Sequence, residues 1–292
     1  MPPAHSIRLI PRLDIKGDNL VKGIHLEGLR VLGKPEAFAK HYYEQGADEL
    51  VYQDVVASLY GRNSLTDIVS KTAREISIPL TVGGGLRTMD DLRNLLCAGA
   101  DKVAINTAAI ASPSFISEAA NALGSSTIVI SIEAIRESDG TFLAYTDNGR
   151  EHTGLDVFDW AEQAVAQGAG EIIVTSADKE GTGEGFELEL LQGIAARVSV
   201  PVVAHGGAGK PGDAVEAVGA GADAISLASV LHYKEAANLF SSDFDNKNEG
   251  NIEFLQQFRT FGKVGKYELS EFRDALIEAG ISTRQTTIQQ SA

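Results

Sequence analysis

The 292-residue sequence predicts a (β/α)8 barrel, a TIM barrel built from two half-barrel repeats, and three observations predict it. Short β-branched segments alternate with amphipathic segments of helical period along most of the chain. Thirty glycines cluster behind those β-branched segments instead of being scattered. The chain also matches itself after a displacement of 122 residues, which places Pro79 on Pro201. Two matched halves favour eight strands closed into a barrel over an open sheet.

The expected elements follow one another in the order that a barrel requires. The first strand lies within 9–17, where the segment LIPRLDIKG holds a carboxylate near its end. The later strands are expected within 48–55, 78–83, 101–106, 127–134, 171–176, 200–205 and 223–228. Helices are expected within 64–76, 88–100, 112–123, 158–165, 187–198, 211–222 and 270–280. In two of them, Trp160 is expected to pack against the barrel and Cys97 to lie in the core.

The internal repeat supports closure of the sheet. The aligned segments are Gly84-Gly85 with Gly206-Gly207, AGAD at 98–101 with AGAD at 220–223, and GADE at 46–49 with GAGE at 168–171. An open doubly wound sheet would not show one register between its halves. We therefore expect a single barrel domain over 1–292, with ligand groups at the carboxyl ends of its strands.

Three stretches depart from the simple alternation. Residues 133–154 contain Ser-Asp-Gly between alternating runs, which predicts a hairpin in an extended loop. Residues 241–267 begin with Asp, Asn, Lys and Glu and indicate an exposed insertion. Residues 281–292 indicate a flexible tail.

Composition excludes several classes of protein. A net charge of −15 argues against nucleic acid or an anionic membrane as partner, since both require a basic surface. A single cysteine excludes an internal disulfide framework and a multi-cysteine metal site. Neither a signal peptide nor an apolar run of about 18 residues is found, so we expect a soluble, cytoplasmic protein. No group of His, Asp and Glu has metal-ligand spacing, and no metal or cofactor is expected.

Phosphate binding is the first chemical signal at the strand ends. Each half has a glycine pair behind one strand and a small polar residue at the end of the next. These residues are Gly84, Gly85, Asn106 and Thr107 in the first half, and Gly206, Gly207, Ala228 and Ser229 in the second. Glycine lets backbone N–H groups approach an anion, and the following helix adds partial positive charge. The pattern predicts a ligand with a phosphate at each end, although glycines that only form tight turns would look the same.

Two carboxylates, Asp14 and Glu133, end strands on opposite sides of the predicted barrel. Such a pair suits general acid and base catalysis if the surroundings separate the two pKa values. The alternative is structural, for instance an ion pair of Asp14 with Lys16 or Lys22. Asp54, Asp178 and Glu180 also belong to the mouth and can orient the ligand or its loops. His205 begins a glycine turn and is either a phosphate donor or simply solvated.

Four charged residues stand at or near the starts of the first, second, fourth and sixth strands. They are Arg8, Glu49, Lys102 and Glu171. Pointing inward, they would form a ring of two cations and two anions at the floor of the barrel, where charge is costly unless it is paired. Such a ring is either a structural plug or a gate for a small molecule that enters along the axis.

Taken together, these motifs resemble the cyclase subunits of imidazole glycerol phosphate synthase, in the histidine-biosynthesis barrel family. The resemblance covers residues 7–232 and the final helix. Its motifs are LDIKG with LVKG, GADELV, DVVAS, TVGGG, ADKVAINTAA, the GAGEI to GT-G run, GGAGK, AGADA and ASV. Their number and order make the resemblance far more specific than any single glycine motif.

The resemblance implies that a glutaminase partner on the N-terminal face delivers ammonia through the barrel. The ammonia attacks a ribulosyl bisphosphate derivative of aminoimidazole carboxamide ribotide, which yields imidazole glycerol phosphate and the free ribotide. By position, Asp14 and Glu133 match the catalytic pair, Lys22 an active-site lysine, and Asp101 the partner interface. The floor residues match an ammonia gate. The phosphate-site positions matched are Gly85, Asn106, Thr107, Gly181, Gly207, Ala228 and Ser229.

Several mouth positions depart from the family pattern. Glu133 replaces an aspartate, Ile135 a lysine, Glu180 an aspartate and His205 a serine, and Gln53 replaces an apolar residue. One methylene displaces a carboxylate by roughly an ångström, which can cost about 100-fold in rate. Two alternatives therefore stand beside the cyclase. One is a paralogue that aminates another phosphorylated or nucleotide-linked acceptor, such as a surface sugar, and the other is a non-catalytic ammonia conduit. A related sugar-phosphate isomerase is disfavoured because its floor ring would lack a purpose.

Overall fold

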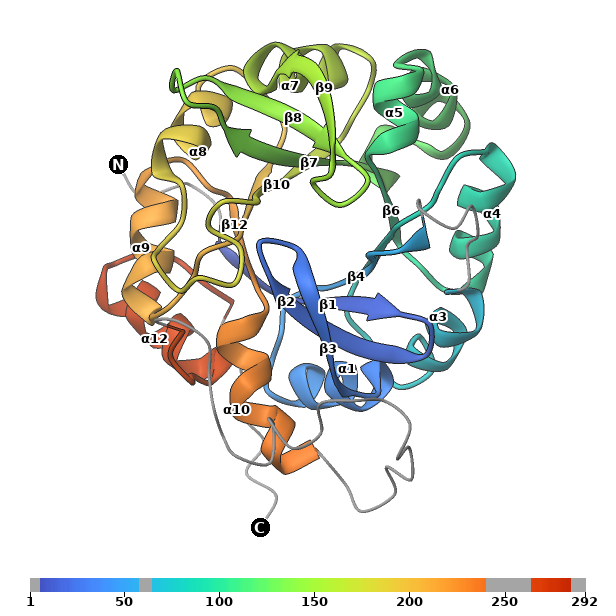
Figure 1. Cartoon of the computed structure of the whole chain (residues 1–292). Coiled ribbons are helices and arrows are strands. Elements are labelled where there is room, and N and C mark those ends of the chain that lie inside the picture. The colour runs from blue at the N-terminus through green and yellow to red at the C-terminus, as the bar shows by residue number, and fades with distance from the viewer. Residues whose placement is uncertain (1–5, 58–64, 240–263, 285–292) are drawn as a thin grey trace.

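In the computed structural model, which describes residues 6–57, 65–239 and 264–284, eight parallel strands of these ranges form a closed barrel (Figure 1). They are β1 (Arg8–Lys16), β4 (Leu50–Asp54), β5 (Leu80–Gly83), β6 (Lys102–Ile105), β7 (Ile128–Arg136), β10 (Glu171–Ser176), β11 (Val202–His205) and β12 (Ala224–Leu227). Parallel pairing of β12 with β1 and of β7 with β10 completes the circle. The predicted (β/α)8 fold is confirmed.

Helices surround the barrel and bury their apolar faces against the outer side of its strands (Figure 1). They are α1 (Pro35–Glu44), α3 (Thr66–Thr72), α4 (Met89–Ala98), α5 (Thr107–Ala111), α6 (Ser114–Leu123), α7 (Val157–Ala166), α8 (Leu188–Ala195), α9 (Pro211–Gly219), α10 (Ser229–Leu239) and α12 (Leu269–Glu278), with a short 3-10 turn at Ser125–Thr127. Trp160 on α7 packs in the core as predicted. The prediction for Cys97 is wrong, because α4 buries Leu92 and Leu95 and leaves Cys97 exposed.

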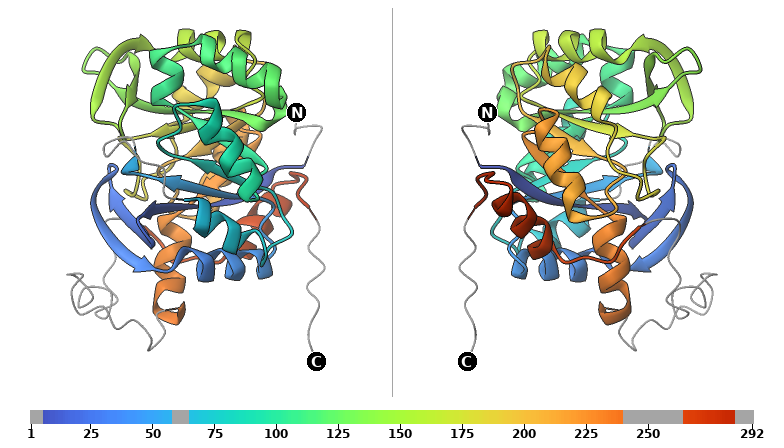
Figure 2. Two further views of the ribbon diagram at one scale, coloured as in Figure 1. Left: turned by 90° about the vertical axis from the view of Figure 1, so that its right-hand side faces the viewer. Right: turned by 90° about the vertical axis from the view of Figure 1, so that its left-hand side faces the viewer.

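Two antiparallel hairpins extend the barrel at one end (Figure 2). The first consists of β2 (Asn19–Ile24) and β3 (Glu27–Gly33), and the second of β8 (Phe142–Thr146) and β9 (Glu151–Asp156). The second hairpin, which pairs with the end of β7, confirms the prediction for 133–154. The first hairpin, in which β2 folds back on β1, was not predicted from the sequence. Both hairpins lie at the carboxyl ends of the barrel strands, so they border the mouth.

Inside the barrel, side chains form layers along the axis. On β1 the residues at even positions point inward, and Ile10 joins a cluster separate from the one between sheet and helices. This cluster, called the lumen layer here, contains Ile10, Val51, Ala104, Val129, Ile173, Val203 and Ala224. The lumen layer lies one inward position above Arg8, at the floor, and one below Arg12, toward the mouth. The lumen layer therefore lies between the floor of the barrel and its mouth, and Thr81, which pairs in register with Val51, is a polar side chain at its lower edge.

The half-barrel repeat is visible in matched contacts. Leu80 donates its backbone N–H to the carboxylate of Asp101, and Val202 donates in the same way to Asp223, both at 2.8 Å. The repeat also explains two of the glycines. A Cβ at Gly84 would lie 2.4 Å from the carbonyl oxygen of Asp54, and one at Gly206 would lie 2.7 Å from that of Ser176. These four pairs are all related by the displacement found in the sequence.

Parts of the predicted insertion and tail pack against the barrel. Residues 240–263 of the insertion and 285–292 of the tail lie outside the described residues. Val264 is buried, and Tyr267 donates its backbone N–H to the carbonyl of Val230, so this end of the predicted insertion packs on the barrel. In the predicted tail, Ser282 accepts a hydrogen bond from Ile7 at 2.8 Å, and Arg284 binds Asp48. A flexible tail from residue 281 is therefore wrong for 281–284, which is held against the start of β1.

Candidate active site at the barrel mouth

The four floor residues form one network of ion pairs, called the floor ring. Arg8 pairs with Glu49 at 2.6 Å and also with Glu171, and Lys102 lies 3.0 Å from Glu49 and 2.7 Å from Glu171. Thr81 adds a hydrogen bond of 2.6 Å to Glu49. Each cation contacts both anions, so the ring is closed and its net charge is zero. The sequence placed these residues correctly, and their inward orientation follows from strand alternation.

A second network, called the mouth cluster, consists of Arg12, Asp14, Lys22 and Glu180. Asp14 lies 2.9 Å from Nε of Arg12 and 2.7 Å from Nζ of Lys22, and Lys22 also pairs with Glu180. All four side chains are at least 96% buried. Burial alone would raise the pKa of Asp14, but the charges of Arg12 and Lys22 outweigh it and hold that pKa well below its usual range. Asp14 is therefore ionised at every physiological pH.

Glu133 lies across the mouth in a different environment. Its Oε2 accepts a hydrogen bond of 2.8 Å from the backbone N–H of Gly149, in the turn between β8 and β9. Burial raises the pKa of Glu133 to about 7, and neither this hydrogen bond nor the charge of Arg12 offsets it. Near neutral pH, Glu133 is thus divided between its acid and its carboxylate form. The two carboxyl groups have the separated pKa values that an acid and base pair requires.

The first phosphate site predicted from sequence is an open hollow beside Glu133. Of the predicted residues, Gly84, Gly85, Asn106 and Thr107 line it together with Glu133. Its other lining residues are Gln53, Asp54, Val55, Leu86, Arg87, Ala104, Ile105, Ser131, Asp147 and Asn148. Asn106 donates to the carbonyl of Tyr145 at 3.1 Å, and its own side-chain oxygen is buried without a partner among the described residues. Asp14 does not line this hollow.

The second predicted phosphate site is covered. The loop after β10 lies over the glycine pair, and Gly185 donates its N–H to the carbonyl of Gly207 at 2.8 Å. Gly206, Ala228 and Ser229 are buried, and Gly181 packs against Gly23 of the first hairpin. A separate hollow is lined by residues of this loop, within 179–185, together with residues within 209–216 and 265–267. The structure therefore groups the first-half residues around one hollow and buries the second-half residues.

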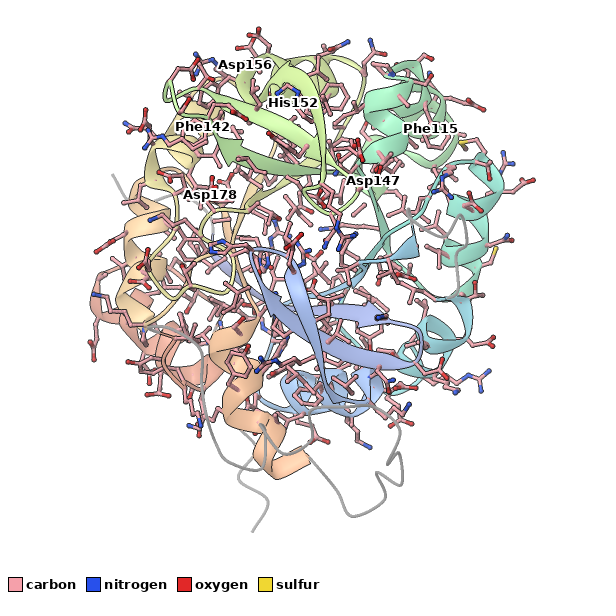
Figure 3. The ribbon with its side chains drawn as sticks, viewed as in Figure 1. Phe115, Phe142, Asp147, His152, Asp156 and Asp178 are labelled. Carbon is pink, nitrogen blue, oxygen red and sulfur yellow. The ribbon has the colours of Figure 1, made fainter. Side chains whose placement is uncertain are left out.

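Two turns meet over the mouth (Figure 1). Asn148, in the turn between β8 and β9, donates its side-chain amide to the carbonyl of Leu26 in the turn between β2 and β3, at 2.8 Å. Leu26 donates its own N–H to Glu180 at 3.3 Å. In Figure 3, Asp147 lies beside the mouth, whereas His152 lies further out on β9. The two turns thus connect the part of the mouth that contains Glu133 with the mouth cluster.

Arg12 is the main residue that the sequence analysis missed. Its side chain lies in the lumen, where Nη1 donates to Thr175 at 3.1 Å, and its charge acts on both Asp14 and Glu133. Its signal was the alternation on β1, because positions 8, 10, 12 and 14 share one face. Asp54 and Asp178, which were also expected to orient the mouth, accept hydrogen bonds from the backbone of Val56 and Arg136. They hold the loops in shape.

Asp101 is exposed at the opposite end, where its carboxylate holds Leu80. Within the described ranges, no three His, Cys, Asp or Glu side chains are grouped as metal ligands. No helix of the described part is long and apolar enough to cross a membrane.

Comparison with known proteins agrees with this arrangement. The model of the family described as histidine biosynthesis protein matches residues 8–237. An imidazole glycerol phosphate synthase subunit HisF from Legionella pneumophila is 59% identical over 205 residues, which cover 70% of this chain and 97% of that protein. Subunits of the same name from Bifidobacterium adolescentis and Lactococcus lactis subsp. lactis are 46% and 48% identical, over 78% of this chain and 91% and 89% of theirs. The chain belongs to the histidine biosynthesis protein family, among the cyclase subunits of imidazole glycerol phosphate synthase.

Proposed function

We propose that this protein uses ammonia to cleave and cyclise a ribulosyl bisphosphate derivative of aminoimidazole carboxamide ribotide. The products are imidazole glycerol phosphate and the free ribotide. The observation that supports this most directly is the order of groups along the barrel axis. A neutral ring of charges lies at the floor, an apolar layer follows, and two carboxyl groups with separated pKa values lie at the mouth.

In this proposal Glu133 is the general acid and base. A group with a pKa of about 7 can donate a proton to a leaving nitrogen or oxygen and recover it within one cycle. Asp14 remains an anion throughout and stabilises positive charge that develops on the attacking nitrogen or on the ring as it closes. Lys22 and Arg12 keep Asp14 ionised and oriented. The sequence suggested the pair, and the different surroundings of its members support these roles.

The substrate would extend across the mouth with one phosphate at each end. The hollow formed by Gly84, Gly85, Asn106 and Thr107 would hold the first phosphate through backbone N–H groups. The second would bind at the equivalent positions of the other half, which are Gly181, Gly206, Gly207, Ala228 and Ser229. Because the loop after β10 now covers that site, substrate binding would have to displace the loop. The glycines in both halves leave space for backbone groups to approach an anion.

A glutaminase is proposed as the partner, bound at the amino ends of the barrel strands near the floor ring and Asp101. Ammonia released there would pass the ring of Arg8, Glu49, Lys102 and Glu171 and reach the mouth without entering the solvent. The named relatives are subunits of a synthase, which supports an assembled enzyme. Since its substrates are phosphorylated metabolites, the proposal also places the complex in the cytoplasm.

The direct test is an assay with purified protein, ammonium chloride and the bisphosphate substrate. The proposal predicts consumption of the substrate and appearance of imidazole glycerol phosphate, followed by chromatography and mass spectrometry. A glutaminase-bound sample supplied with glutamine should give the same products. Normal binding of the glutaminase without turnover of this substrate would refute the proposal in favour of another acceptor or of an ammonia conduit.

A further inference from the structure

His205 ends β11 with its side chain inside the barrel. Val203, two residues earlier on the same strand, belongs to the lumen layer, so His205 points the same way one step nearer the mouth. It pairs in register with Thr175 of β10, which in turn pairs with Glu133 of β7. The imidazole is 4% exposed. His205 therefore lies where the apolar lumen meets the groups proposed to be catalytic.

The hydrogen bonds of the ring determine which nitrogen holds the proton. Nδ1 lies 3.2 Å from the backbone carbonyl oxygen of Ser226. A carbonyl only accepts, so Nδ1 must be the donor. Burial, together with the charges of Arg12 and Lys22, holds the pKa of His205 well below its ordinary value, and the ring is neutral. Nε2 is left with a lone pair, buried and without a partner among the described residues.

The other buried histidine of the described chain shows what a structural role looks like. Nδ1 of His232 lies 2.7 Å from the hydroxyl of Tyr42, and its Nε2 lies 2.8 Å from the carbonyl oxygen of Arg12. Both of its nitrogens are occupied within the fold. A buried acceptor without a partner is unfavourable, and such groups in native proteins usually serve a ligand or a bound water. His205 has the arrangement of a ligand-binding group.

The surroundings of Nε2 restrict what it can bind. The ligand must donate a hydrogen, because Nε2 only accepts. It must be small, because the imidazole is enclosed. It must also be neutral when it arrives, because the apolar lumen layer on one side gives a cation no partner and the charges of Arg12 and Lys22 lie nearby. Ammonia meets all three conditions, whereas ammonium does not.

We propose that Nε2 of His205 binds ammonia at the upper end of the lumen and orients it for attack. This inference rests on the proposed function. In the step, the ammonia lone pair forms a bond to the electrophilic carbon of a C=O or C=N group of the acceptor. The π electrons of that group move to its oxygen or nitrogen, which takes the proton of Glu133. The carboxylate of Glu133 then takes one N–H proton from the attached nitrogen, so the adduct is a neutral amine, Glu133 again holds its proton and His205 stays neutral.

Binding can be tested on the wild-type protein, without substrate and without any variant. The 15N resonances of the histidine rings are recorded at alkaline pH, where ammonia is abundant, during titration with ammonium chloride. The expected result is a saturable shift of Nε2 of His205, while the signals of His232 stay in place and potassium chloride at equal ionic strength has no effect. Absence of a saturable shift would mean that Nε2 holds at most a water, and the proposal would be wrong.

Kinetics test the binding of ammonia. The variant His205→Leu should lower kcat/KM for ammonia by about 10-fold, the effect of losing one hydrogen bond, while the KM for the bisphosphate stays within about twofold. His205→Gln, which keeps an acceptor at this position, should restore kcat/KM for ammonia. Equal loss toward both substrates would indicate a structural role and overturn the proposal. If the wild type shows no cyclase activity, the proposed function fails, and the NMR titration still decides whether His205 binds ammonia.

Discussion

Two carboxyl groups of the same chemical type differ in protonation here because of their neighbours. Asp14 contacts two cations, so burial does not neutralise it. Glu133 accepts hydrogen bonds from the backbone of Gly149 and the side chain of Asn106 and has a similar depth of burial, so its neutral form is favoured. In the proposed mechanism, the placement of Arg12 and Lys22, and not the choice between aspartate and glutamate, therefore leaves Glu133 as the group that exchanges a proton.

The pH dependence of turnover reports on Glu133. At saturating ammonia, kcat should fall as the pH rises through about 7, because the proton that Glu133 donates is lost. The variant Glu133→Gln should lower kcat by roughly 100-fold and make it independent of pH in this range. Stopped assays between pH 5.5 and 8.5, at a fixed concentration of free ammonia, would check this. An unchanged pH profile in the variant would assign the titration to another group.

The raised pKa of Glu133 also makes the stability of the fold depend on pH. The pKa of Glu133 is about 7 in the folded chain, against an ordinary value of 4.5, so the folded state binds the extra proton between these limits. The stability that Glu133 contributes through this shift is therefore complete below about pH 4.5. It is lost as the pH rises to about 7, by on the order of 3 kcal/mol. Glu133→Gln should raise the Tm at pH 8 and leave it nearly unchanged at pH 5, as measured by calorimetry. A lower Tm at pH 8 would contradict the raised pKa.

At the scale of elements, the two hairpins decide how the mouth is closed. The turn of the second hairpin has positive φ angles at Asp147, Asn148 and Gly149, and that of the first has them at His25 and Leu26. Such angles are unusual for residues other than glycine and are maintained here by contacts between the turns. The first hairpin was not predicted because His25 and Leu26 are not typical turn residues. The second contains Asp-Asn-Gly, which is a turn signal.

Removal of the bridge between these turns should loosen the mouth. In Asn148→Ala the hydrogen bond to Leu26 is lost, at a cost of about 1 kcal/mol. We expect faster amide hydrogen exchange in residues 24–28 and a higher KM for the bisphosphate, with a kcat close to that of the wild type. Asn121→Ala, on the exposed side of α6, serves as the control. Unchanged exchange in 24–28 would show that the bridge does not hold the first hairpin.

The half-barrel repeat offers a matched pair for testing the partner surface. Asp101 and Asp223 hold the starts of β5 and β11 through identical hydrogen bonds, so Asp101→Ala and Asp223→Ala should each lower stability by about 1–2 kcal/mol. If Asp101 also contacts the glutaminase, only Asp101→Ala should weaken the complex, by roughly 10-fold in Kd. Calorimetric titration with the glutaminase would measure this. Equal affinities for the two variants would remove Asp101 from the interface.

For the whole molecule, the architecture could be predicted from the sequence more completely than the site. The 122-residue repeat, the strand starts and the floor ring could be predicted because strand alternation and one register determine them. The burial of Lys22 could not, since it depends on how the first hairpin folds back over β1. The inward position of Arg12 could have been predicted from the alternation on β1. The covered second phosphate site was missed because a loop from another strand lies over Gly207.

The floor ring can be tested as a conduit of the assembled enzyme. Lys102→Met leaves Glu49 and Glu171 with one cation, which should lower stability by roughly 2 kcal/mol for this partly exposed lysine. Glutamine-driven turnover should fall several-fold, because the two carboxylates then repel across the axis, while turnover with added ammonia stays within twofold. Lys40→Met removes an exposed ion pair with Glu75 and is the matched control. A proportional loss of both activities would argue against a conduit.

The lumen layer restricts the protonation state of any molecule that moves along the barrel axis. Because its side chains are all apolar, an ion that crossed it would give up its hydration shell and receive nothing in exchange. In the proposed conduit, nitrogen therefore arrives above it only as a free base, and the fourth hydrogen of ammonium stays on the far side. The acidity of the solution below the floor, and not that at the mouth, would then set how much nucleophile is delivered.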